Sequence, residues 1–472
     1  MTKDAISNDA ITNDAGTSRT LTAALCDEAL QLVTGGALAQ QLQSLRRRVD
    51  EPVRLAVVGP AGAGASTLVN ALVGARVSAT APGGVSSVAL WFRFAAEPTV
   101  AVVRRDGSTA PLPFDRSDGL RIDLETIDPA IVQRIDVGWP SPLLQRVTVV
   151  DAVELDSTSI DVDAHVVVLP DPSTGRHALS RVGAGLTPSP VTTITVVTRA
   201  DDVGNAAPDA LEQAVVLSAA RGALVVCGLL GEAAISLSAV DVDTVRAVAA
   251  LGPDATASVL RTADRFVTTD LDIDAAARTA LLARLGLYGT RRSVALLQQQ
   301  PSLSAADLRS AMRSWSRIDT LVAQIEQRVV ARSSALRAAS VVNGIRRVAH
   351  DLIAVDDRRA HELERAVSRT TASLPELDQL RILHLASTGQ LPISEGDVAD
   401  LELLWSGAGV AERLGLPVTT SPSTLRAMVL AAIARWRERG DDMFATPDLR
   451  DACDTVVRSY EGIFQELDRP EV

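Results

Sequence analysis

The sequence contains almost no lysine: Lys3 is the only one among 46 basic residues, and arginine supplies the rest. Such a bias is typical of a GC-rich genome, in which drift turns a tolerated lysine into arginine and so keeps the positive charge. A lysine position that has become uncharged therefore indicates that the charge itself is no longer needed there.

Cysteine, aromatic residues and long apolar runs are also scarce. Cys26, Cys227 and Cys453 show no metal or redox spacing, which favours a reducing cytoplasm. Aromatic residues make up 3% of the chain and hydrophobic residues 47%, so alanine, valine and leucine must build the core. The longest uncharged stretches, such as 185–198, fall short of the roughly 20 residues that a membrane-spanning helix needs. We therefore expect a cytoplasmic protein, with any membrane contact peripheral at the inner membrane face.

The formal net charge of −12 argues against a nucleic-acid partner and against a general surface for anionic membranes. Residues 1–20 are polar and lack the features of a signal peptide, so we expect a disordered N-terminal tail. A chain of 472 residues is expected to hold two or three domains.

Strand and helix signals divide the chain into two parts. Between residues 51 and 250, short β-branched runs alternate with helical or loop segments, which predicts an α/β domain with a mostly parallel sheet and helices on both faces. The expected strands lie at 54–58, 88–94, 100–104, 135–139, 147–150, 165–169, 192–197 and 224–227. Residues 251–472 carry helical signals instead and predict an elongated α-helical bundle. A helix at 21–50 would join that bundle, because its apolar stripe needs a partner.

The glycine-rich segment 59–67 follows the first expected strand and precedes a helix at 66–74. It matches the phosphate-binding loop G-x-x-x-x-G-K-[ST], whose backbone N–H groups wrap phosphates, whose lysine reaches the β/γ-phosphates and whose hydroxyl binds Mg²⁺. Ala65 stands where the lysine belongs. A Gly/Ala-rich turn between a strand and a helix is the structural alternative.

A nucleotide hydrolase needs further groups on the γ-phosphate side. Ser78, Thr80, Ser86 and Ser87 offer hydroxyls in a mobile segment, and Ser86 is the best placed; all four are equally compatible with a solvated loop. The strand 147–150 ends in Asp151, the expected metal-side aspartate, and with Ser66 it forms the candidate metal pair. Glu154 stands where an Asp-x-x-Gly motif has glycine, which places negative charge beside the γ-phosphate.

The base-reading element is better preserved. Guanine is usually selected by [NT]-K-x-D at the end of a later strand, and here Thr198, Arg199 and Asp201 follow the strand 192–197. Arginine can replace the lysine stem and stack on a planar base. The predicted nucleotide-binding set is Gly59, Gly62, Gly64, Ala65, Ser66, Thr67, Ser86, Asp151, Thr198, Arg199 and Asp201, for GTP or GDP with a doubtful Mg²⁺.

These residues, with the segments 89–93, 137–140, 198–204 and 285–289, resemble bacterial dynamin-like proteins, most closely the mycobacterial isoniazid-inducible group. The resemblance runs from about residue 21 to the C-terminus. It implies a P-loop GTPase-like domain followed by a helical bundle, and a protein that remodels or fuses membranes in a nucleotide-dependent way, often with a paralogue.

The departures from the family pattern fall on the γ-phosphate side: Ala65, Ser86, Glu154 and a segment of only 13 residues between Asp151 and His165. They suggest a pseudo-GTPase subunit that assembles with an active dynamin-like partner or with itself. The alternative is a divergent but active GTPase that takes its missing cation from an arginine such as Arg76 or Arg176. An ATP- or acyl-dependent P-loop enzyme is a third, weaker option, against which Thr198 to Asp201 argues.

Overall fold

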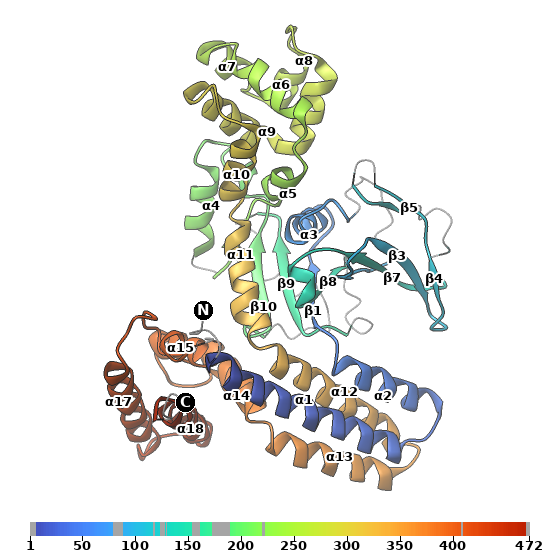
Figure 1. Ribbon diagram of the computed structural model, residues 1–472, viewed down its shortest axis with the longest axis vertical. Helices are drawn as coiled ribbons and strands as arrows, with labels where there is room; N and C mark the ends of the chain where they lie inside the picture. Colours follow the sequence, from blue (N-terminus) through green and yellow to red (C-terminus); the bar gives the residue numbers. More distant parts are fainter. Residues whose placement is uncertain are drawn as a thin grey trace. The chain divides into compact units, whose positions relative to one another are not determined.

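The computed structural model describes residues 6–78, 88–116, 119–122, 128, 130–152, 161–171, 189–219, 222–406 and 409–468. The chain forms two compact units. Unit 1 comprises Met1–Val53, Ser189–Thr192 and Glu326–Val472, and unit 2 comprises Arg54–Pro188 and Thr193–Ile325. Figure 1 shows the helices and strands of both units.

A sheet of nine strands forms the centre of unit 2, in the order β11-β10-β9-β1-β8-β2-β7-β3-β4. The strands are β1 (Val53–Val58), β2 (Leu90–Phe94), β3 (Thr99–Arg104), β4 (Thr109–Pro111), β7 (Val132–Trp139), β8 (Val147–Ala152), β9 (Ala164–Leu169), β10 (Thr193–Val197) and β11 (Leu224–Val225). A separate hairpin pairs β5 (Phe114–Asp115) with β6 (Arg121–Ile122).

The sheet is mostly parallel, as predicted, but it is mixed on one side. Strands β1, β9, β10 and β11 run parallel, with Val57 opposite Val166 and Val196 opposite Leu224. Strand β2 is antiparallel to β8, and β3 is antiparallel to both β7 and β4. β1, β8 and β9 are buried along their whole length, which is why they read as continuous β-branched runs.

Helices complete unit 2. They are α3 (Ala65–Val73), α4 (Ala210–Ala219), α5 (Gly228–Ser236), α6 (Ala239–Ala249), α7 (Pro253–Val259), α8 (Ala263–Thr268), α9 (Ala275–Gln299), α10 (Ala305–Ser316) and α11 (Ile318–Ile325), with the short turns η1 (Leu143–Gln145) and η3 (Ala200–Asp202). The N-cap Asp274 accepts a hydrogen bond from the Ala277 N–H. Helix α9 bends at Gly286, whose φ of 64° breaks the helical path.

Unit 1 is helical. It contains α1 (Ile6–Leu32), α2 (Gly36–Arg48), η4 (Glu326–Val330), α12 (Ser333–Ile353), α13 (Asp357–Ala372), α14 (Pro375–Ser387), α15 (Glu395–Leu404), α16 (Val410–Arg413), α17 (Pro422–Gly440) and α18 (Pro447–Asp468). One apolar core joins α1 and α2 to α12 and α13, and a second joins α14 and α15 to α17 and α18. The N-terminal helices therefore pack with the C-terminal ones, as their apolar residues predicted.

Two expectations about the domains differ from the structure. Residues 6–20 form the first part of α1 rather than a disordered tail, and Gly35, with a φ of 104°, separates α1 from α2 inside the segment expected to be one helix. Residues 251–325 belong to unit 2 rather than to the bundle. The reason is an apolar core in which Phe266, Leu281 and Met312 pack with residues of α5 and α6.

Candidate functional site

The loop between β1 and α3 has the backbone that the glycine pattern predicts. Gly62 and Gly64 have φ values of 76° and 91°, in the left-handed region that favours glycine, and Gly64 is the N-cap of α3. A Cβ on Gly59 would lie 2.8 Å from the main-chain oxygen of Val168, so glycine also allows the loop to approach β9. The result is a strand, a glycine loop and the N-terminus of a helix, the arrangement in which N–H groups and the helix dipole favour a phosphate.

Ala65 is the first residue of α3, and it is 8% exposed. Ser66 and Thr67 follow it in the first turn of the helix. The structure therefore puts a small methyl group at the position where the motif supplies an ammonium group to the β- and γ-phosphates. The backbone of the loop can still donate hydrogen bonds, but its main cation is missing.

Thr198 connects the base-reading element to this loop. Its hydroxyl donates a hydrogen bond to the main-chain oxygen of Ala63, and it lies 3.3 Å from the main-chain oxygen of Leu169. Its backbone N–H also donates to Leu169, at 3.1 Å. The sequence therefore placed Thr198 correctly at the end of β10, and the structure adds that this residue fixes the position of the glycine loop.

Asp201 is a buried carboxylate in η3 and is 9% exposed. Burial raises the pKa of Asp201 to about 6; the charge of Asp202 adds to the rise, and a hydrogen bond from the Cys227 thiol opposes it. A Cβ on Gly286 would lie 3.5 Å from Asp201 Oδ2, so the bend of α9 passes next to this carboxylate. This buried carboxylate is the group that the sequence predicts to recognise guanine.

Arg199 lies at the surface of the same turn. Its guanidinium pairs with Asp202 at 3.1 Å, and both side chains are more than half exposed. The pairing leaves the aliphatic stem of Arg199 beside the base-reading turn, where the lysine stem of the usual motif would pack.

Asp151 lies at the end of β8 and is buried. The Ser78 hydroxyl donates a hydrogen bond to Asp151 Oδ2, whereas Oδ1 has no hydrogen-bond partner in the described part of the chain. Burial raises the pKa of Asp151, and hydrogen bonding to the hydroxyls of Ser78 and Ser66 opposes the rise. The structure thus brings the predicted pair Ser66 and Asp151 together, although Ser78 already uses one of the carboxylate oxygens that a Mg²⁺ shell would use.

The sequence did not predict a buried polar network that lies next to Asp151. Asn70 on α3 is fully buried; its Oδ1 accepts hydrogen bonds from the N–H groups of Val77 and Ser78, at 2.8 and 2.7 Å. Its Nδ2 donates to Glu232 of α5 at 2.9 Å, and Glu232 pairs with Arg76 at 3.0 Å. The available signal was a single asparagine in an otherwise apolar helix. The network fixes residues 76–78, which follow α3 in the chain.

The remaining candidates on the γ-phosphate side cannot be placed. Ser86 and the alternatives Thr80 and Ser87 lie outside the described residues, as do Glu154 and Arg176. No group of three or more His, Cys, Asp or Glu side chains among the described residues is arranged to hold a metal ion. No helix in the described ranges is long and apolar enough to cross a membrane.

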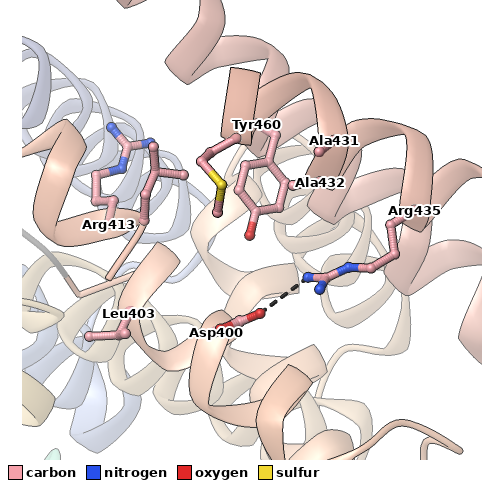
Figure 2. Close-up of a pocket in the computed structure, with 9 residues that line it drawn as sticks. Asp400, Leu403, Arg413, Ala431, Ala432, Arg435 and Tyr460 are labelled. Atoms are coloured by element: carbon pink, nitrogen blue, oxygen red, sulfur yellow. Dashed lines mark hydrogen bonds and ion pairs between the residues drawn. The ribbon is translucent and has the colours of Figure 1, made fainter. Parts of the chain in front are cut away.

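A small cavity of about 180 Å³ lies in unit 1, apart from the residues of the nucleotide motifs. Figure 2 shows the Tyr460 hydroxyl facing the ion pair that Asp400 forms with Arg435, 3.1 Å long. Burial raises the pKa of Tyr460 to about 12, so this hydroxyl stays protonated at neutral pH. With its acid and base already paired, this cavity offers no activated group for chemistry.

A mostly parallel sheet with a glycine loop between β1 and the N-terminus of α3 gives this chain the fold class of a P-loop GTPase-like protein. No family model matches the chain. The isoniazid-induced protein IniC of Mycobacterium tuberculosis, in the strains CDC 1551 / Oshkosh and ATCC 25618 / H37Rv, is 30% identical over 464 residues, which cover 90% of this chain and 93% of the relative. The chain belongs to the family of IniC, and the resemblance to the isoniazid-inducible dynamin-like group is confirmed.

Two solved structures of an oligomerised bacterial dynamin pair, described as a mechanism for the long-range sensing and tethering of membranes, are also similar to this chain. They have TM-scores of 0.32 and 0.31 and are 11% and 12% identical in sequence. The alignments cover 94% and 95% of this chain and 90% of each structure.

Proposed function

We propose that this IniC-family protein is a pseudo-GTPase subunit that takes part in membrane remodelling together with an active dynamin-like partner or a second copy of itself. It would work in the cytoplasm, with peripheral contact at the inner membrane face. The observation that carries the proposal is the methyl group of Ala65, placed at the first residue of α3 in a loop whose backbone is otherwise suited to phosphate.

Phosphoryl transfer explains why this position matters. Its catalysis consists almost entirely of positioning and of electrostatic stabilisation of the transferred group. The loss of the loop cation therefore removes a large part of the stabilisation of the transition state. Glu154 would add a negative charge to the same side. The loop N–H groups and the N-terminus of α3 would still hold a diphosphate weakly, and Asp201 would hold a guanine base. If Mg²⁺ accompanies the nucleotide, Ser66 and Asp151 would bind it and screen the phosphate charge.

The alternative function, a divergent and active GTPase, needs a cation from elsewhere in the chain. Arg76 is one of its two candidates, and the Arg76 guanidinium lies 3.0 Å from Glu232 Oε1. An arginine that neutralises a buried glutamate is a poor source of charge for a phosphate, because moving it would leave the Glu232 charge without a cation beside it. This contact favours the pseudo-GTPase over the active enzyme.

Calorimetric titration of the full chain with GTP and GDP tests the proposal, followed by turnover assays with and without liposomes. We expect weak or absent nucleotide binding and slow or absent GTP turnover. Turnover at the rate of a relative with an intact lysine, lost in Asp201→Ala, would overturn the proposal in favour of the active enzyme. Mixing the chain with such a relative tests the partner: a change in that relative's turnover, or a shared sedimenting species, is expected.

A further inference from the structure

A second cavity, of about 540 Å³, lies in unit 1 between α17 and α18. Its size is within the range of small-molecule sites. Three arginines and two aspartates line it, together with an indole: Arg437, Arg450, Arg458, Asp441, Asp454 and Trp436. The cavity therefore offers both signs of charge to one ligand.

Several of these groups have no partner in the part of the chain that the structure describes. Arg437 pairs with Glu461 at 2.5 Å, and the Arg458 guanidinium donates to the Asp454 main-chain oxygen and the Thr455 hydroxyl. By contrast, no hydrogen bond or ion pair engages the side chains of Arg450, Asp441 or Asp454 within the ranges that the structure describes. Trp436 is 1% exposed, and its Nε1 donor is buried without an acceptor there. One free cation, two free anions and one buried donor thus share this cavity.

The loop that joins α17 to α18 carries two exposed apolar side chains next to the cavity. Met443 is 80% exposed and Phe444 is 84% exposed, and Asp441, two residues before Met443, lines the cavity. The backbone of the loop is fixed, since Asp442 Oδ1 accepts from the Phe444 N–H at 2.8 Å and Ala445 is buried in the core of α17 and α18. The loop therefore holds both side chains away from the protein.

We propose that this end of unit 1 binds the headgroup of a zwitterionic phospholipid of the phosphoethanolamine class, with Met443 and Phe444 inserted among the acyl chains. Arg450 would bind the phosphate, and the carboxylates of Asp441 and Asp454 would bind the ammonium group. The two carboxylates oppose a headgroup with negative charge alone, as does the net charge of −12. Met443 and Phe444 lie beside a cavity that is lined by positive and negative side chains. This combination of apolar and charged groups fits an amphiphile in a bilayer better than it fits a free anion. The inference rests on the membrane role in the proposed function.

Vesicle co-sedimentation of the full chain without nucleotide tests the site. The vesicles are phosphatidylcholine mixed with either phosphatidylethanolamine or anionic phosphatidylglycerol. We expect tighter binding to the phosphatidylethanolamine vesicles, weakened about tenfold or more in Met443→Ser/Phe444→Ser, because two apolar insertions are lost. Arg450→Ala should weaken it by about threefold to tenfold, because a charged hydrogen-bond donor is lost.

Matched controls separate the site from general surface effects. Val418 is 79% exposed elsewhere in unit 1 and Arg347 is exposed on α12, so Val418→Ser and Arg347→Ala should bind vesicles like the unchanged chain. Thermal unfolding shows whether each variant folds, and the single change Phe444→Ser replaces the double variant if that one does not.

The headgroup assignment would be overturned if the loop and Arg450 variants bound vesicles as tightly as the unchanged chain, or if the chain preferred phosphatidylglycerol vesicles. It would also be overturned if inorganic phosphate released the chain from vesicles as effectively as glycerophosphoethanolamine does. If the loop variants lose self-association but not vesicle binding, the loop is a contact between copies and the inference is wrong. Vesicle binding that ignores the variants refutes this site alone, whereas no binding to either vesicle also removes the membrane role from the proposed function. GTP turnover, measured separately, tests the proposal that the chain is a pseudo-GTPase.

Discussion

The base side and the phosphate side of the candidate nucleotide site differ in what their polar groups do within the protein. On the base side, Asp201 is a buried carboxylate whose pKa is raised, a condition that destabilises the ionised form in the absence of a ligand. On the phosphate side, the lysine is replaced by Ala65, Asn70 hydrogen-bonds to Glu232 and to the Ser78 N–H, and the Ser78 hydroxyl donates to Asp151, which is also a buried carboxylate with a raised pKa. The comparison teaches that Asn70 ties most polar groups of the phosphate side into the fold and leaves only Asp151 Oδ1 without a partner among these described groups, whereas the base side keeps a buried carboxylate that is costly to ionise.

The largest expected effect tests whether the phosphate side is held by Asn70. Asn70→Ala leaves the N–H groups of Val77 and Ser78 without their acceptor and removes a donor to Glu232, so we expect a loss of about 3–5 kcal/mol in the free energy of unfolding. Urea denaturation measures it. Asn343→Ala, at an exposed position on α12, is the control and should change stability by less than about 0.5 kcal/mol. Equal effects of the two changes would contradict the structural role of the network.

The base side is tested by the titration of Asp201. Its pKa is about 6 in the folded protein, above the ordinary aspartate value of 3.8, so the stability tied to its protonated form is present below pH 3.8 and lost as the pH rises through 6. Asp201→Asn removes the buried charge, and we expect a gain of about 2–3 kcal/mol in the free energy of unfolding at pH 7.5 that fades toward pH 4.

Urea denaturation at both pH values checks this expectation. The neighbouring Asp202 is 61% exposed and paired with Arg199, so Asp202→Asn should have little effect at either pH. A destabilised Asp201→Asn variant at pH 7.5 would mean that the carboxylate is needed for folding rather than kept for a ligand.

Restoring the missing cation sharpens the comparison from the phosphate side. Ala65→Lys should tighten the binding of GDP and GTP by about tenfold to a hundredfold, because one charged hydrogen bond to phosphate contributes about 1.5–3 kcal/mol. Isothermal titration measures the affinity. Ala65→Met, of similar length without charge, is the control and should give no gain. If both variants bind alike, the loop does not hold phosphate and the base side alone resembles a GTPase.

The smallest effect concerns the link between the two sides. Thr198→Val removes the hydroxyl that donates to Ala63, and we expect a loss of about 1 kcal/mol in unfolding free energy. Thr195→Val on the same strand is the control, because no hydrogen bond of its side chain occurs in the described structure. A Thr198 variant as stable as the Thr195 variant would show that the base-reading turn and the glycine loop are independent.

Much of the fold could be predicted because local chemistry determines it. The β-branched runs at 54–58, 147–150 and 165–169 correspond to β1, β8 and β9, since strands buried on both faces need continuous apolar residues. Ser66 and Asp151 do lie close together, because the helix after the glycine loop begins beside β8, but their role as a metal pair stays a prediction. The boundary expected at residue 250 was wrong, since periodicity predicts helices but does not say which core they join.

The sequence by itself determined the order of strands and helices, the glycine loop and its missing lysine, because glycine conformation and side-chain charge are local properties. Only the tertiary structure decided that Asn70, Arg76 and Glu232 meet, that Thr198 supports the loop, and that Met443 and Phe444 lie in solvent beside a charged cavity. Burial and partnership depend on residues distant in the chain. No local sequence pattern predicts burial and partnership. These two properties distinguish a polar group that stabilises the fold from one that is free to bind a ligand.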